Sequence, residues 1–297
     1  MNYSKIRGVI AAMVTPLDDV TGEVSFDGLS KLLNYLVEGG VHGLFPCGST
    51  GEGLLLSKKE RMQIVEFIVR EVKGKIPIIV HTGSIHLDEA IHLTCHSRDI
   101  GAQGAALIPP YYYGMDEAAM ENYFGTIAAS APDFPLYIYN IPGNTKNTVS
   151  VPLMLNLSSK YSNIIGLKES SMDFMNFINF QQVLPLDYTI LMGNDAQIYS
   201  SVLMGGAGAI SATATVFPEK VVEIYEQLQN GNQSQALQAQ DTVTKLRAIW
   251  RKYPPIAPYK IALRLKGINV GLPRLPLRTL TSNEINRLIS DLESLDI

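Results

Sequence analysis

Hydrophobic residues along the chain form short runs that alternate with longer segments of helical periodicity. Most runs are continuously apolar, which is typical of strands buried on both faces of a parallel sheet. We predict eight such strands, at residues 9–15, 42–46, 76–81, 105–108, 136–140, 164–168, 189–193 and 208–211. Between them, apolar residues recur three and four positions apart, as at Leu29, Leu32, Leu33 and Leu36, and this spacing predicts amphipathic helices.

Capping residues mark several of the predicted helices. Ser57 and Glu60 form a capping box at the start of an apolar helical face, and Pro218 stands near the start of a later helix. Gly39 and Gly40 follow the first helical pattern, where glycine commonly ends a helix.

Eight strand–helix units predict an α/β fold, a (β/α)8 TIM barrel over residues 1–231. An open doubly wound sheet is the alternative, but its phosphate-binding fingerprint GxGxxG is missing after the first strand, which leads to Thr15 and Pro16. After residue 231 the strand pattern stops. Helical patterns at 232–250 and 256–266, and a capping box at Thr281 and Glu284, predict a C-terminal helical extension over 232–297.

Composition and charge exclude several classes of protein. The 24 basic and 28 acidic residues leave a net charge of −4, which is a poor balance for binding nucleic acid and too mixed for a disordered chain. No apolar run reaches the ~18 residues that span a bilayer, and the run after Lys5 and Arg7 lacks a signal-peptide cleavage pattern. Cys47 and Cys95 cannot form a disulfide framework, so we expect reduced cysteines and a cytoplasmic protein.

In a barrel, chemistry sits at the carboxyl ends of the strands. The sixth strand leads directly into Lys168, and burial there would favour the neutral amine that attacks a ketone to form a Schiff base. An ion pair with Glu169 or another acid is the structural alternative. The glycine-rich turn 47–53 after the second strand offers backbone N–H groups and the Ser49 and Thr50 hydroxyls to a small carboxylate, unless it is only a tight turn.

Tyrosines end two further strands. Alternation along the fifth strand puts Tyr137 and Tyr139 on the same side, where a phenol near the amine would shuttle protons or simply fill the core. Tyr111, Tyr112 and Tyr113 follow the fourth strand and suit either a pocket or a subunit interface. His92 and His96 are four apart but lack the HExxH pattern, so we expect no metal site.

Four motifs occur together and in order: Gly48-Ser49-Thr50-Gly51-Glu52, Pro110-Tyr111-Tyr112, Tyr139-Asn140-Ile141-Pro142 and Gly166-Leu167-Lys168-Glu169. With Gly193-Asn194-Asp195 and the stretch 205–211, they closely resemble the dihydrodipicolinate synthase / N-acetylneuraminate lyase family over essentially the whole chain. The resemblance implies a class I enzyme without metal or cofactor, acting on pyruvate and an aldehyde. It also implies a homotetramer built as a dimer of dimers.

The resemblance assigns roles to individual residues. Lys168 would form the imine, Tyr139 would shuttle protons, and Thr50 and Tyr112 would complete the relay, Tyr112 from a neighbouring subunit. The remaining positions are implied as substrate contacts: Gly48, Ser49, Thr50, Asn144, Gly193, Asp195, Ile210 and Ser211.

Two departures from the family pattern bear on the substrate. Synthases of the lysine pathway normally carry arginine where this chain has Asn144, and a neutral amide cannot form a bidentate charged clamp. Lys146 would replace it only as a point charge farther along the loop. Sialate lyases normally carry an acid where this chain has Ala196.

We therefore expect a pyruvate-dependent class I aldolase or lyase that cleaves or forms a 2-oxo-3-deoxy sugar acid or a related 4-hydroxy-2-oxo acid. The alternative is a dihydrodipicolinate synthase that condenses pyruvate with aspartate semialdehyde through a divergent carboxylate site. A dehydratase of the same family, and a 2-oxo acid binding homologue without catalysis, are the further alternatives.

Overall fold

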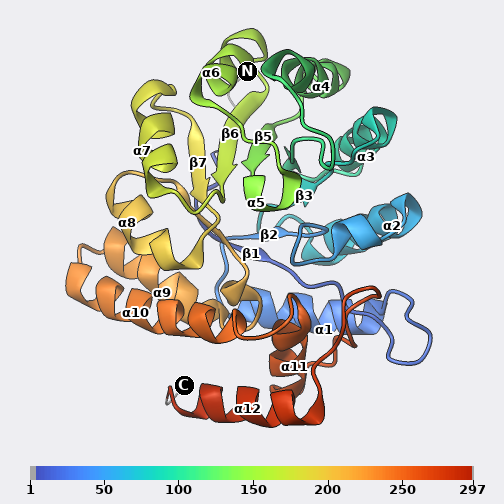
Figure 1. The fold of residues 1–297 in the computed structure, drawn as a ribbon, viewed down its shortest axis with the longest axis vertical. Coiled ribbons are helices and arrows are strands. Elements are labelled where there is room, and N and C mark those ends of the chain that lie inside the picture. Colours follow the sequence, from blue (N-terminus) through green and yellow to red (C-terminus); the bar gives the residue numbers. More distant parts are fainter. Residues whose placement is uncertain (1–4, 296–297) are drawn as a thin grey trace.

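Eight parallel strands form a barrel in the computed structural model, which describes residues 5–295. They are β1 (Gly8–Ala12), β2 (Gly43–Phe45), β3 (Ile79–His81), β4 (Gly104–Leu107), β5 (Leu136–Asn140), β6 (Ile164–Glu169), β7 (Thr189–Met192) and β8 (Gly208–Ser211). The strands pair in chain order, and β8 pairs with β1. A parallel bridge between Leu44 and Ile78 joins β2 to the residue before β3 and closes the barrel (Figure 1).

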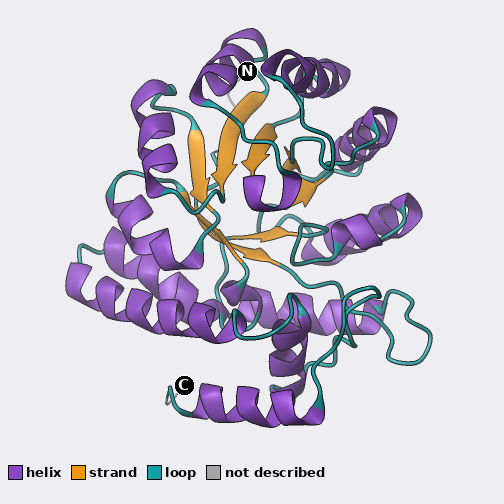
Figure 2. Ribbon diagram, viewed as in Figure 1, coloured by secondary structure: helices purple, strands orange, loops and turns teal. Residues whose placement is uncertain are grey.

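Helices surround the barrel and continue into a C-terminal extension (Figure 2). Those of the barrel are α1 (Phe26–Glu38), α2 (Lys58–Val72), α3 (Leu87–Asp99), α4 (Glu117–Ser130), α5 (Pro142–Thr145), α6 (Val151–Lys160), α7 (Phe174–Val183), α8 (Ile198–Leu203) and α9 (Pro218–Gln229). The extension comprises α10 (Gln233–Trp250), α11 (Ala257–Leu265) and α12 (Ser282–Glu293). The TIM barrel with a helical extension is thus confirmed.

Alternation along the strands divides the core in two. Residues such as Ile10, Tyr137 and Tyr139 fill the barrel interior, while their neighbours such as Val9 and Ile138 pack outward against the helices. The same alternation confirms that Tyr137 and Tyr139 share one side of β5 and point inward.

Some strand ends differ from the prediction. The first apolar run, predicted to extend to residue 15, is a strand only as far as Ala12, and Met13 to Thr15 continue as buried loop toward the barrel mouth. The third predicted strand begins at Ile79 rather than Ile76, because Pro77 has no N–H to donate to a strand ladder. Apolar character reports burial, and the buried loop residues share it.

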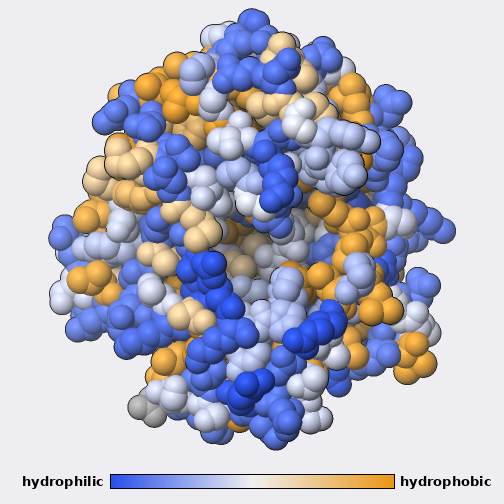
Figure 3. Space-filling model, viewed as in Figure 1, coloured by the Kyte–Doolittle hydropathy of each residue, from blue (hydrophilic) through white to orange (hydrophobic). Residues whose placement is uncertain are grey.

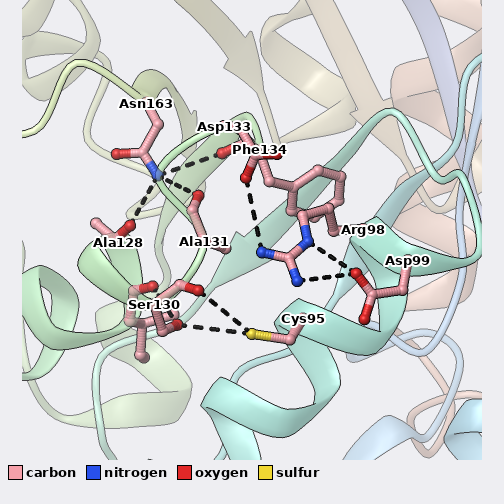
Figure 4. Close-up of polar contacts among 10 residues, drawn as sticks. Cys95, Arg98, Asp99, Ala128, Ser130, Ala131, Asp133, Phe134 and Asn163 are labelled. Carbon is pink, nitrogen blue, oxygen red and sulfur yellow. Dashed lines mark hydrogen bonds and ion pairs between the residues drawn. The ribbon is translucent and has the colours of Figure 1, made fainter.

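Both cysteines are free thiols, as expected. Cys47 is buried beside the site described below, while Cys95 lies on α3 with its Sγ against the Ser130 carbonyl at the end of α4 (Figure 4). Nearby, the Asn163 side-chain amide donates to the carbonyls of Ala128, Ala131 and Phe134, which secures the segment between α4 and β5. No helix within residues 5–295 is long and apolar enough to cross a membrane.

Candidate active site

Lys168 lies inside the barrel near the carboxyl end of β6, and its side chain is enclosed. The residue is 4% exposed, and its Nζ stands 3.9 Å from the centre of the Tyr139 ring and 4.2 Å from that of Phe45. Burial lowers the pKa of Lys168, because the charged amine loses its hydration; the neighbouring Tyr139 and Asp195 oppose this only in part. A larger share of neutral, nucleophilic amine is therefore present than in a solvated lysine.

Glu169 does not pair with this amine. It follows Lys168 on the strand, so the two side chains point to opposite faces of β6. The Glu169 carboxylate accepts hydrogen bonds from the Asn140 amide at 2.8 Å and the Ser171 N–H at 2.5 Å. The ion pair left open by the sequence is therefore wrong, and among the described residues Lys168 has no carboxylate within 4.0 Å.

Tyr139 is placed beside Lys168 by the register of two adjacent strands. It pairs directly with Lys168 across β5 and β6, so both side chains enter the interior at the same level. The rings of Phe45 and His81 meet the Tyr139 ring edge-on at 6.0 Å and 6.1 Å, and these contacts fix its orientation. A phenol held next to a buried amine is suited to moving protons to and from an adduct on that amine.

The turn after β2 has a tightly constrained backbone. Cys47 and Glu52 adopt φ angles of 58° and 55°, which are uncommon for residues with side chains. A Cβ at Gly53 would stand 1.7 Å from the Cys47 carbonyl oxygen, so only glycine fits this close approach. Ser49 and Thr50, at the tip of this turn, line a cleft of about 510 Å³ at the barrel mouth.

A second cleft, of about 310 Å³, adjoins the first and reaches Tyr139. Asn144, Arg251 and Tyr259 line both clefts, so the two form neighbouring parts of one mouth. Figure 3 shows this face of the molecule hollowed near its middle, close to the ends of β5–β7. The structure thus brings the predicted residues Ser49, Thr50, Tyr139 and Asn144 to one opening.

The predicted contacts on β7 and β8 lie at the same end of the barrel. Gly193 and Asp195 line the 310 Å³ cleft, and one oxygen of the Asp195 carboxylate accepts two hydrogen bonds from Thr213. Ser211 is buried and its hydroxyl accepts from the Ala214 N–H, while Ile210 belongs to the interior cluster. Gly48 is buried in the turn, where its carbonyl accepts from the Gly53 N–H.

Tyr112 differs from these residues, because it lines neither cleft of its own chain and is not buried in the barrel interior. Its side chain is 80% exposed, its φ is +79°, and its ring packs edge-on against Tyr113 at 4.9 Å. An unusual backbone angle that presents a tyrosine pair to the exterior fits the predicted role at a subunit contact better than a role within one chain.

Sequence reasoning missed several residues of the mouth, and two of them, Arg247 and Arg251, carry a charge. Both belong to the C-terminal end of α10, in the extension to which the sequence assigned no chemistry. The signal available was their spacing, since residues four apart share one face of a helix. That this face meets the barrel mouth depends on how α10 packs, which the spacing does not reveal.

Known proteins similar to this chain identify its family. The model of the dihydrodipicolinate synthetase family matches residues 5–295. The chain belongs to this family. A 4-hydroxy-tetrahydrodipicolinate synthase from Methanosphaerula palustris is 35% identical over 98% of this chain and 99% of the relative.

Solved structures of this family share the fold. Dihydrodipicolinate synthase from Aquifex aeolicus has a TM-score of 0.93 and 30% identity, and covers 98% of both chains. YagE, an E. coli prophage protein of the dihydrodipicolinic acid synthase family solved with pyruvate, has a TM-score of 0.95 and 28% identity over 99% of both chains. As a family member, this protein is an aldolase-type carbon–carbon lyase.

Proposed function

We propose that the protein is a Schiff-base-forming aldolase whose first substrate is pyruvate. The neutral Lys168 amine attacks the ketone carbon of pyruvate, and water leaves as the imine forms. Tyr139 moves protons to and from the adduct, with Thr50 and a neighbouring subunit's Tyr112 completing the relay in a homotetramer. The protonated imine withdraws electrons from the adjacent carbon, so the carbon–carbon bond forms or breaks without a metal or further cofactor.

The observation that carries this proposal is the enclosed Lys168 amine beside the Tyr139 phenol. Lys260 is as deeply buried as Lys168, but its amine stands 2.6 Å from the Glu52 carboxylate, which neutralises its charge. Among the described residues Lys168 has no such partner, and the Tyr139 ring beside its amine lines the 310 Å³ cleft. Ser49 and Thr50, which line the adjoining 510 Å³ cleft, support binding of the pyruvyl carboxylate.

For the co-substrate, the comparisons support aspartate semialdehyde, the second of our sequence-based expectations, more than a 2-oxo-3-deoxy sugar acid. This support comes from the M. palustris relative, which is named a 4-hydroxy-tetrahydrodipicolinate synthase. Asn144 favours the sugar acid, because it stands at the mouth where a charged clamp would be expected for a carboxylate-bearing aldehyde. Both reactions share the pyruvyl imine and differ in the second substrate that the barrel mouth binds.

Borohydride reduction in the presence of pyruvate tests the imine. We expect a stable pyruvyl adduct by intact mass and its assignment to Lys168 by peptide mapping, with no adduct in Lys168→Met. An adduct on another lysine, or none in folded protein, would overturn the proposal. Condensation of pyruvate with aspartate semialdehyde, set against pyruvate release from 2-oxo-3-deoxy sugar acids, then decides between the two reactions.

A further inference from the structure

We propose that Arg247 and Arg251 form a binding subsite for an anionic group on the aldehyde co-substrate, either a carboxylate or a phosphate. The inference rests on the proposed function, because it concerns the second substrate of the same site. In this proposal α10 of the C-terminal extension holds the aldehyde, and the two clefts at the barrel mouth select aldehydes that carry an anionic group.

The position of the two arginines is the first argument. Arg247 lies in the last turn of α10 and Arg251 is its C-cap, so the two residues are one helical turn apart. Both line the cleft that reaches Tyr139, and Arg251 also lines the cleft that holds Ser49 and Thr50. A molecule that extends outward from Lys168 along Tyr139 therefore meets these guanidinium groups.

The absence of partners is the second argument. Within residues 5–295, neither guanidinium has a carboxylate within 4.0 Å or donates a hydrogen bond, whereas Arg274 and Arg278 both pair with glutamates at 2.8 Å. Cationic residues at a helix C-terminus often bond the last carbonyls, but here neither side chain does so. The Asp195 carboxylate lies on the same cleft, and one of its oxygens is already occupied by Thr213.

Electrostatics point the same way. Partial burial and the adjacent positive charge of Arg251 both lower the pKa of Arg247, and Asp195 opposes them. Two like charges that share a recess repel one another, and an anion bound between them removes this repulsion. Guanidinium groups also match the geometry of carboxylate and phosphate oxygens through paired hydrogen bonds.

An anion subsite on α10 changes what the neutral Asn144 implies about the charge of the co-substrate. The neutral amide lines the same two clefts as Arg251, so charge missing from α5, which follows β5, is supplied from another part of the chain. The departure at Asn144 then marks a relocated anion site, and it no longer argues against an anionic co-substrate.

A comparison of kcat/KM for aldehydes of different charge tests the proposal. Pyruvate would be supplied with succinic semialdehyde, D-glyceraldehyde 3-phosphate or neutral D-glyceraldehyde, and kcat/KM for each aldehyde measured in wild type, Arg247→Gln, Arg251→Gln and the double variant. We expect the anionic-to-neutral ratio of kcat/KM to fall by about 10- to 100-fold in the double variant, mainly through KM, as for the loss of charge-assisted hydrogen bonds. Arg70→Gln, on the outer surface of α2, makes the same charge change away from the mouth and should leave the ratio as it is.

The outcomes separate the two proposals. A fall confined to succinic semialdehyde identifies a carboxylate site, and a fall confined to the phosphate ester identifies a phosphate site. Borohydride trapping of pyruvate on Lys168 in the same variants shows whether the imine site still works. An unchanged ratio in a double variant that traps pyruvate overturns the subsite alone, as does a wild type that traps pyruvate yet uses no anionic aldehyde. A wild type that traps no pyruvate overturns the proposed function.

Discussion

A lysine enclosed in a barrel interior destabilises the fold when it is protonated, because the charged amine loses its hydration. The folded-state pKa of Lys168 is lowered by burial, so between that value and the unfolded value of ~10.4 the unfolded chain binds more protons. Stability therefore rises with pH across this window, and below the window the protonated amine opposes folding in full.

Lys168→Met should accordingly lose imine formation and gain stability at pH 7, by roughly 1–2 kcal/mol, as is common when a functional site is relieved of strain. The advantage should shrink as the pH rises toward ~10.4 and vanish above it, where the lysine is neutral in both states. Urea unfolding at equal protein concentration at the two pH values measures this. Lys245→Met, which removes an exposed lysine on α10, serves as the control, and a pH-independent difference at Lys168 would contradict the argument.

Gly53 allows a test of the turn 47–53, which we propose binds the pyruvyl carboxylate through Ser49 and Thr50. Because a Cβ there would meet a backbone oxygen at 1.7 Å, Gly53→Ala must displace the turn that carries Ser49 and Thr50. We expect at least about tenfold slower trapping of pyruvate, together with reduced stability. Gly114→Ala is the matched control, since nothing lies within 4 Å of a Cβ at that loop position. Equal behaviour of the two variants would mean that the turn adapts.

At the scale of elements, a buried ion pair joins the extension to the barrel. Lys260 of α11 and Glu52 of the turn after β2 are both fully enclosed and stand 2.6 Å apart. Lys260 also donates to the Leu272 carbonyl, and Glu52 accepts from the Arg274 N–H. The C-terminal segment therefore anchors the same turn that presents Ser49 and Thr50 to the cleft.

Removing one partner should leave a buried, uncompensated charge, which typically costs about 3–5 kcal/mol. We expect Lys260→Met and Glu52→Gln each to lower stability on this scale and to raise KM for pyruvate, with a smaller loss in the double variant. A double-mutant cycle by urea unfolding measures the coupling. Replacing the exposed pair Asp27 and Lys31 on α1 gives the comparison. Additive losses at Glu52 and Lys260 would show that the two act independently.

How far the sequence predicted these elements depended on the range of the interactions involved. Strand and helix periodicity is local, so all eight strands were found, and the position of Lys168 at a strand end made it a candidate for imine chemistry. The link from Lys260 to Glu52 spans more than two hundred residues and leaves no local pattern. Arg247 was missed for the same reason, because its place at the barrel mouth depends on how α10 packs.

At the scale of the whole molecule, the site is incomplete in a single chain if Tyr112 belongs to the proton relay. Within one chain this tyrosine is 80% exposed and absent from the clefts that Tyr139 and Thr50 line. In a twofold interface the same residue of each chain reaches the other, so each site would borrow a Tyr112 from its neighbour. Exchange of subunits between two defective variants tests this arrangement directly.

Lys168→Ala and Tyr112→Phe should each have little activity alone, the first for want of the imine and the second for want of the relay. In a mixed dimer, the site that retains Lys168 in the Tyr112→Phe chain receives an intact Tyr112 from its partner. Random exchange of equal amounts makes half of the dimers mixed, each with one complete site, so about a quarter of wild-type activity should return. Dissociation and reassociation of the mixture, followed by an assay of pyruvate turnover, measures the recovery. A mixture no more active than the sum of its parts, in protein shown by mass spectrometry to have exchanged, would place Tyr112 outside the relay.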